Sequence, residues 1–166
     1  DDSLERRARV LQAMGEDEMR RDRLGVAQER LTAAYASTEA LMLRDPTNPD
    51  RVFAHAQSEY WVGELARRQC DLAEGERRMR LYAALAERLR QIDPDRVRAL
   101  REVGYANGNL CALSIRKGEA APIDHCRIGL DAMREVFRLR PQEQQAHVDL
   151  INRLSWAGEY NWNNGR

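Results

Sequence analysis

The feature that most constrains the fold of this chain is a repeat of about 48 residues. Its clearest marker is a proline that closes each unit, at Pro46, Pro94 and Pro141, with spacings of 48 and 47 residues. Small residues recur at nearly the same offsets in a second column, which contains Gly15, Gly63, Cys111 and Gly158. A third column, about seven residues further on, contains Asp22, Cys70, Gly118 and Gly165. Three columns in register predict an array of similar structural units.

Between these columns the apolar residues recur at steps of three and four. In the first unit they are Leu24, Ala27, Leu31, Ala34 and Leu41. This spacing is typical of an amphipathic helix. Each unit is therefore predicted to hold a helix A before the turn column and a helix B after it, ending where proline pushes the preceding residue out of helical conformation. We expect helix A at about 4–20, 50–68, 96–116 and 142–163, and helix B at about 23–43, 71–91 and 121–139.

The predicted fold is all-α: an antiparallel helical-hairpin solenoid of about seven helices. One hairpin cannot bury its own apolar face, so neighbouring hairpins must stack. We expect residues 1–166 to form a single domain with repeats at about 1–46, 47–94 and 95–141 and a half repeat at 142–166. Because the chain begins at Asp1 without a methionine, we expect it to be a fragment of a longer protein.

The repeat resembles the tetratricopeptide repeat in three features: the small residue in helix A, a turn such as Cys70-Asp71-Leu72, and the closing Asp-Pro. The usual repeat has about 34 residues, so the resemblance is to a long-helix variant, and HEAT-like or other helical solenoids fit the same pattern. The resemblance implies a protein-interaction module that binds a partner segment on its concave face. Stretches such as Ser58–Ala66 look similar to repeats of large bacterial signalling and regulatory proteins.

An arginine column lies five residues after the small-residue position, at Arg20, Arg68 and Arg116, and the resemblance places it on the concave face. In one interpretation, Glu16–Arg20 and Glu64–Arg68 are i,i+4 pairs that contribute about 0.3–0.5 kcal/mol each on a solvated face. In the other, the arginines form a ladder for a carboxylate-bearing or phosphorylated peptide, because guanidinium groups bind such groups bidentately. Ala112 stands at the partner position of Arg116, which is therefore the arginine expected to be free.

Two further columns supply candidate groove residues. One contains Gln12, Tyr60 and Gly108, and the other contains Gln57, Tyr105 and Asn152. Tyr60 and Tyr105 can anchor a partner through an apolar ring and a polar hydroxyl. Tyrosine at a seam between repeats is an equally common arrangement.

Charge and hydropathy exclude several classes of protein. The chain has 27 basic and 27 acidic residues, which argues against nucleic-acid binding. No apolar run approaches the roughly 18 residues that cross a bilayer. The three cysteines are odd in number and form no C-x-x-C pair, so we expect neither a disulfide framework nor a zinc site, and a reducing cytoplasm as the compartment.

The sequence contains no motif of an enzyme active site. His-Glu-x-x-His, a phosphate-binding glycine-rich loop and Gly-x-Ser-x-Gly are all missing. Asp124-His125-Cys126 places a thiol beside an imidazole, but sequential residues on a helix point to different faces. We therefore expect no catalytic residue, cofactor or metal. Cys70 falls in the turn column, where a left-handed backbone is expected, so an exposed thiol that reacts with oxidants is a further hypothesis.

The last thirteen residues, 154–166, contain Trp156, Tyr160 and Trp162. Trp156 falls in the column of Trp61, so the segment is predicted to be a fourth helix A without its helix B. Its apolar residues then either cover the last hairpin or lie open, and an open patch predicts a homodimer. A self-associating spacer is the alternative to a peptide-binding groove, and under a third interpretation the two tryptophans bind a ligand.

Overall fold

The computed structural model describes residues 1–117, 125–163 and 165. Across these residues the secondary structure consists of seven α-helices and contains no strand. The helices are α1 (Asp2–Arg20), α2 (Leu24–Arg44), α3 (Pro49–Arg68), α4 (Leu72–Ile92), α5 (Arg96–Lys117), α6 (His125–Leu139) and α7 (Gln144–Asn163). The all-α prediction is confirmed, and the helix ends lie within two residues of the predicted ends wherever both are described. The predicted first residues of α6, at 121–124, lie outside the described residues, as does Gly118.

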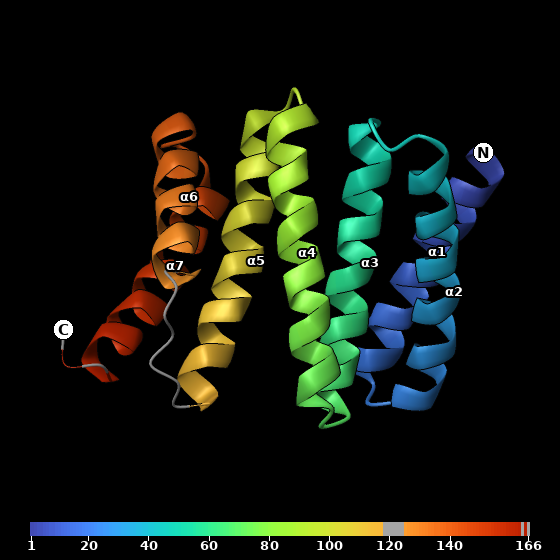
Figure 1. Cartoon of the computed structure of the whole chain (residues 1–166), viewed down its shortest axis with the longest axis horizontal. Coiled ribbons are helices and arrows are strands. Elements are labelled where there is room, and N and C mark those ends of the chain that lie inside the picture. The colour runs from blue at the N-terminus through green and yellow to red at the C-terminus, as the bar shows by residue number, and fades with distance from the viewer. Residues whose placement is uncertain (118–124, 164, 166) are drawn as a thin grey trace. The chain divides into compact units, whose positions relative to one another are not determined.

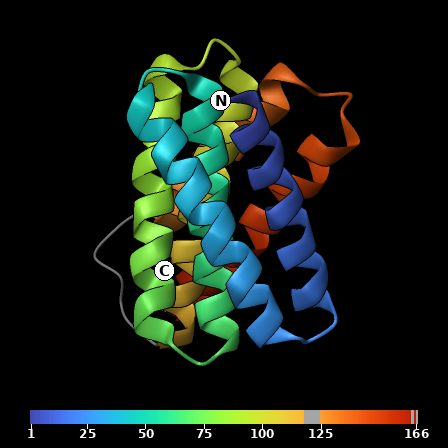
Figure 2. The same ribbon diagram turned by 90° about the vertical axis from the view of Figure 1, so that its right-hand side faces the viewer.

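The helices group into two compact units, Asp1–Ile92 and Asp93–Arg166. In the first unit α1 packs on α2, α2 on α3 and α3 on α4, and α1 also touches α3. In the second unit α5 packs on α6, α6 on α7, and α7 also packs on α5. The antiparallel hairpins of each unit can be followed in Figure 1 and Figure 2. The division falls at the predicted boundary between the second and third repeats; a single domain over 1–166 stays a prediction.

The turn column has the backbone that its position predicts. Asp22, Cys70 and Gly165 have φ angles of 58°, 65° and 63°. A left-handed residue at this point ends helix A and lets the chain reverse into helix B. Asn48 starts α3 in the complementary way, because its Oδ1 accepts hydrogen bonds from the backbone N–H of Asp50 and Arg51 at 3.0 and 3.2 Å.

The small-residue column marks a close approach of helix B to helix A. A Cβ atom on Gly15 would lie 2.6 Å from Cγ of Leu31, and one on Gly63 would lie 3.0 Å from Cε of Met79. Both partner side chains are buried. Glycine is needed at these two positions because any larger residue would push the two helices of the hairpin apart.

The third hairpin has a disulfide at this crossing. Cys111 of α5, in the small-residue column, is bonded to Cys126 of α6, and their Cα atoms are 4.8 Å apart. The prediction that the cysteines form no disulfide was wrong, because the hairpin brings together two cysteines that are 15 residues apart in sequence. The pairing also removes the cysteine-based reason for expecting a reducing cytoplasm. Cys70 is free and exposed, as the turn column predicted.

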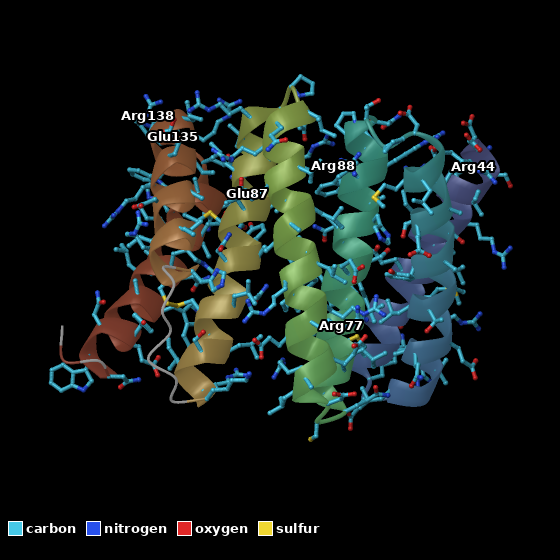
Figure 3. All side chains as sticks on the ribbon, viewed as in Figure 1. Arg44, Arg77, Glu87, Arg88, Glu135 and Arg138 are labelled. Atoms are coloured by element: carbon cyan, nitrogen blue, oxygen red, sulfur yellow. A yellow bond between two sulfur atoms is a disulfide. The ribbon has the colours of Figure 1, made fainter. Side chains whose placement is uncertain are left out.

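The exposed helix faces carry many ion pairs between residues three or four apart. Glu135 and Arg138 on α6, labelled side by side in Figure 3, are an example, with Nε of Arg138 2.7 Å from Oε2 of Glu135. Pairs of this kind add little stability individually because water competes for both charges. Many of the charged residues in the sequence belong to such pairs, so their number does not by itself indicate a ligand.

Candidate functional site

The first unit contains a pocket of about 410 Å³ between α1, α2 and α3. Buried side chains of Ala8, Thr38 and Leu41 line its base. Phe53 and Ala54 of α3 add apolar surface, and the polar lining consists of Glu5, Arg9, Gln12, Asn48, Asp50, Arg51 and Gln57. Two predicted groove residues, Gln12 on α1 and Gln57 on α3, thus line one pocket. Its volume is in the range that binds a small ligand or a few side chains of a peptide.

The pocket lining contains equal numbers of acidic and basic side chains, but its two arginines differ in their ion pairs. Arg51 pairs with Asp1 and Glu5, at Nη2–oxygen distances of 2.7 and 3.2 Å. Arg9 is exposed, and among the described residues it has no ion-pair or hydrogen-bond partner. The amide nitrogen of Gln12 donates to Glu16 at 3.1 Å. Arg9 is therefore the cation of the lining that can bind a carboxylate of a ligand without breaking an existing pair.

A polar cluster of buried and half-buried side chains adjoins the pocket and consists of Tyr35, Thr38, His55, Ser58, Glu59 and Arg78. Thr38 links the two, since its Oγ1 lies 3.0 Å from Oγ of Ser58 and 3.2 Å from Nδ1 of His55. Glu59 accepts hydrogen bonds from the Tyr35 hydroxyl at 3.2 Å and from Arg78 at 3.0 Å. The cluster joins α2, α3 and α4 through groups that satisfy one another.

Burial and charge shift the pKa values of several of these groups. Burial lowers the pKa of His55, against the opposing effect of Glu59. Burial and then Glu59 raise the pKa of Tyr35. Outside the cluster, hydrogen bonds from Arg77 and Arg78 lower the pKa of Glu74 to about 2. His55 and Glu59 are both buried, so a ligand in the pocket would meet Thr38 rather than either of them, and the pair is poorly placed for acid–base chemistry.

At the equivalent position of the second unit, between its two helix A elements α5 and α7, the described side chains contact one another. Tyr105, which corresponds to Arg9, donates its hydroxyl to the carboxylate of Asp149, 3.0 Å from each oxygen. Burial and Asp149 raise the pKa of Tyr105 to about 12. Arg153 covers Gly108, because a Cβ atom there would lie 1.3 Å from Nη1 of that arginine. The two units therefore differ in their described residues at this position.

The remaining predicted groove residues occupy different environments. Arg20 and Arg68 form the i,i+4 pairs of the simpler interpretation, at 3.7 Å from Glu16 and 3.4 Å from Glu64. Arg68 also donates to the carbonyl of Met19 at 2.8 Å, at the end of α1. Tyr60 is half-buried and its ring lies 4.9 Å from Trp61 and 5.8 Å from Tyr82. Arg116 and Asn152 are exposed in the second unit.

Sequence reasoning missed several residues of the pocket. Arg9 stands 48 residues before Gln57, so the column that named Gln57 also contains it. Thr38 and Leu41 lie on α2, a helix B, and no column of helix A residues could identify them. They reach the pocket because α1 and α3 touch only slightly and leave α2 accessible between them.

Comparison with models of protein families and with curated proteins found no match for this chain. In the described part of the chain, no group of three or more histidine, cysteine, aspartate or glutamate residues is placed to hold a metal ion. None of the described helices combines the length and the apolar character that a membrane crossing requires. We take the pocket between α1, α2 and α3 as the candidate site.

Proposed function

We propose that this chain is a protein-interaction module built from tetratricopeptide-like repeats, and that it binds a peptide segment of a partner protein in the pocket between α1 and α3. The observation that supports the proposal is the pocket of about 410 Å³ lined by Gln12 and Gln57 from two successive helix A elements. In the other unit Tyr105, at the position of Arg9, instead donates its hydroxyl to Asp149. The module resembles those of larger bacterial signalling or regulatory proteins in the cytoplasm, and this setting is part of the proposal.

The lining indicates what kind of peptide would fit. Amide side chains such as Gln12 and Gln57 can each donate and accept hydrogen bonds, which suits the backbone of an extended peptide. The base offers apolar surface from Ala8, Leu41 and Ala54 for a small side chain. Arg9 can pair with a carboxylate beside it. The pocket therefore favours an extended acidic segment with a small apolar residue.

Selection from a random peptide library on the intact chain tests this proposal. Peptides recovered on the wild-type chain are titrated by calorimetry against Ala54→Leu, which fills the pocket, and against Arg9→Ala. We expect Ala54→Leu to weaken binding by at least about tenfold and Arg9→Ala to weaken acidic peptides selectively. Ala36→Leu makes the same change at an exposed position of α2 and should leave binding unchanged. Recovery of no peptide, or equal binding to Ala54→Leu, contradicts the proposal.

The arginine column can be separated from the pocket in the same experiment. If Arg20, Arg68 and Arg116 formed the recognition surface, changing all three to alanine would abolish binding. The pocket proposal expects that triple variant to bind the selected peptide normally, because none of the three lines the pocket. Circular dichroism establishes that each variant is folded before it is titrated.

A further inference from the structure

Helix α7 carries apolar side chains on two opposite faces. On the inner face Ala146 and Leu150 pack with Leu100, and Tyr160 packs with the Cys111–Cys126 disulfide. The outer face consists of Val148, Ile151, Leu154, Gly158 and Trp162. Its four large residues are exposed, Val148 to 44%, Ile151 to 61%, Leu154 to 46% and Trp162 to 84%. A surface helix normally turns polar residues outward, and a helix that is apolar on both sides is normally covered on both.

Gly158 shows what is missing from this outer face. It belongs to the column of Gly15 and Gly63, and those two glycines receive Leu31 and Met79 from an antiparallel helix B. A Cβ atom on Gly158 would meet nothing within 4 Å. The outer face of α7 therefore has the glycine notch of a helix A but lacks a large aliphatic side chain to fill it.

We propose that the outer face of α7 is a dimer interface, which packs antiparallel against the outer face of α7 in a second copy of this chain. Leu154 and Gly158 are one helical turn apart. A two-fold axis close to the level of Trp156 therefore brings Leu154 of each copy onto Gly158 of the other. This repeats between two molecules the contact that Leu31 makes with Gly15 inside the first hairpin.

Charge does not oppose this pairing. Of the three charged side chains of α7, Asp149 is buried on the inner side, where it pairs with Arg101 and Tyr105. Arg153 packs against Gly108 of α5, also on the inner side. Glu159 follows Gly158 and is exposed. Because successive residues of a helix are about 100° apart, it lies at the edge of the outer face, where its carboxylate stays in water. Two copies can therefore approach without burying an unpaired charge.

The size of the face indicates how tightly the copies would associate. One exposed tryptophan supplies about 150–250 Å², and a single helix face brings the total to the lower limit of specific interfaces, on the order of 1,000 Å² for both copies. We therefore expect a reversible, concentration-dependent dimer. It does not depend on the proposed peptide pocket, which lies in the other unit.

Sedimentation equilibrium of the intact chain over a wide concentration range tests the dimer. A Cys70→Ser background prevents cross-linking through the exposed thiol. We expect monomer and dimer in equilibrium, and a dissociation constant at least about tenfold higher for Leu154→Glu and for Ile151→Glu. Both positions are solvent-exposed in the monomer, so the variants should fold normally by circular dichroism. Leu43→Glu, at a 69% exposed position of α2, is the matched control and should dimerise normally.

Gly158→Ala gives a second and independent readout. Alanine favours a helix more than glycine does, so this variant should raise the melting temperature of the monomer at low concentration. The added Cβ should at the same time clash with Leu154 of the second copy and weaken the dimer several-fold. A chain that stays monomeric at every concentration overturns the proposal, and so does a dimer that tolerates both Leu154→Glu and Gly158→Ala.

Discussion

Nη1 of Arg78 on α4 lies 3.0 Å from Oε2 of Glu59 on α3, and both side chains are largely withdrawn from water. The small-residue column makes this ion pair possible. A Cβ atom on Gly63 would lie 2.9 Å from Cβ of Arg78, so glycine lets α4 approach closely enough for the arginine to reach Glu59. Arg78 also lies 4.8 Å above the centre of the Tyr35 ring, which ties α2 into the same contact.

Glu59→Gln should destabilise the first unit. Glu59 is buried and accepts hydrogen bonds from both Tyr35 and Arg78. Arg78 keeps a second partner in Glu74 at 2.6 Å, so the loss should be smaller than the about 3–5 kcal/mol expected when a buried charge loses its only partner. Urea denaturation followed by circular dichroism measures the loss in the free energy of unfolding. Glu87→Gln is the matched control, because Glu87 pairs with Arg90 at 2.8 Å on the surface and should cost less than about 1 kcal/mol. Equal losses from both changes would show that the Arg78–Glu59 pair is not a major source of stability.

Stability should fall as the pH drops below neutral because of His55. Burial lowers the pKa of His55 in the folded state, whereas the unfolded chain has an ordinary histidine pKa of about 6.5. Below that pH the unfolded state binds a proton that the folded state does not, so the free energy of unfolding decreases until the lower folded pKa is reached.

His55→Gln should reduce this pH dependence, as measured by urea denaturation at pH 8 and pH 5. The exposed His147 provides the matched control, and His147→Gln should retain the dependence of the wild-type chain. If His55→Gln retains it as well, the proton uptake on unfolding belongs to another group.

Changing both Cys111 and Cys126 to serine should destabilise the second unit by about 3 kcal/mol, the chain-entropy value for a loop of this length. The two cysteines are 15 residues apart in sequence. Thermal and urea denaturation under non-reducing conditions, which keep the wild-type disulfide intact, measure the effect. Cys70→Ser is a control that should change little. Thiol titration of the folded, unreduced chain should find one reactive group, and Cys70→Ser should remove it. Three reactive thiols in that titration would contradict the disulfide.

Cys70→Gly should stabilise the chain. Cys70 has a φ of 65°, a left-handed conformation that costs an ordinary residue about 1–2 kcal/mol and costs glycine little. Since glycine also gains freedom in the unfolded chain, we expect a net gain of about 0.5–1 kcal/mol. Asp22→Gly, at a φ of 58°, should gain less, because aspartate tolerates this region better. Thermal denaturation compares the two, and a lower melting temperature for Cys70→Gly would contradict the strain.

The candidate site was only partly predictable. The column that contains Gln57 and the column that contains Gln12 follow from the repeat, and both residues do line the pocket. Tyr105 shares a column with Gln57 but is engaged by Asp149. Residues at equivalent positions of the repeat therefore have different contacts, because the neighbouring helix supplies a different residue in each unit.

The sequence by itself determined the seven helices, those of their predicted ends that lie in the described residues, and the left-handed turns at Asp22 and Cys70. These features depend on apolar spacing, proline and the backbone preferences of single residues, all of which act within a few residues. Only the tertiary structure decided the Cys111–Cys126 bond, the pocket beside Thr38 and the open notch at Gly158. Each of these depends on which side chain a packed helix brings to a given point. The packing of the helices is set by contacts between residues far apart in the sequence.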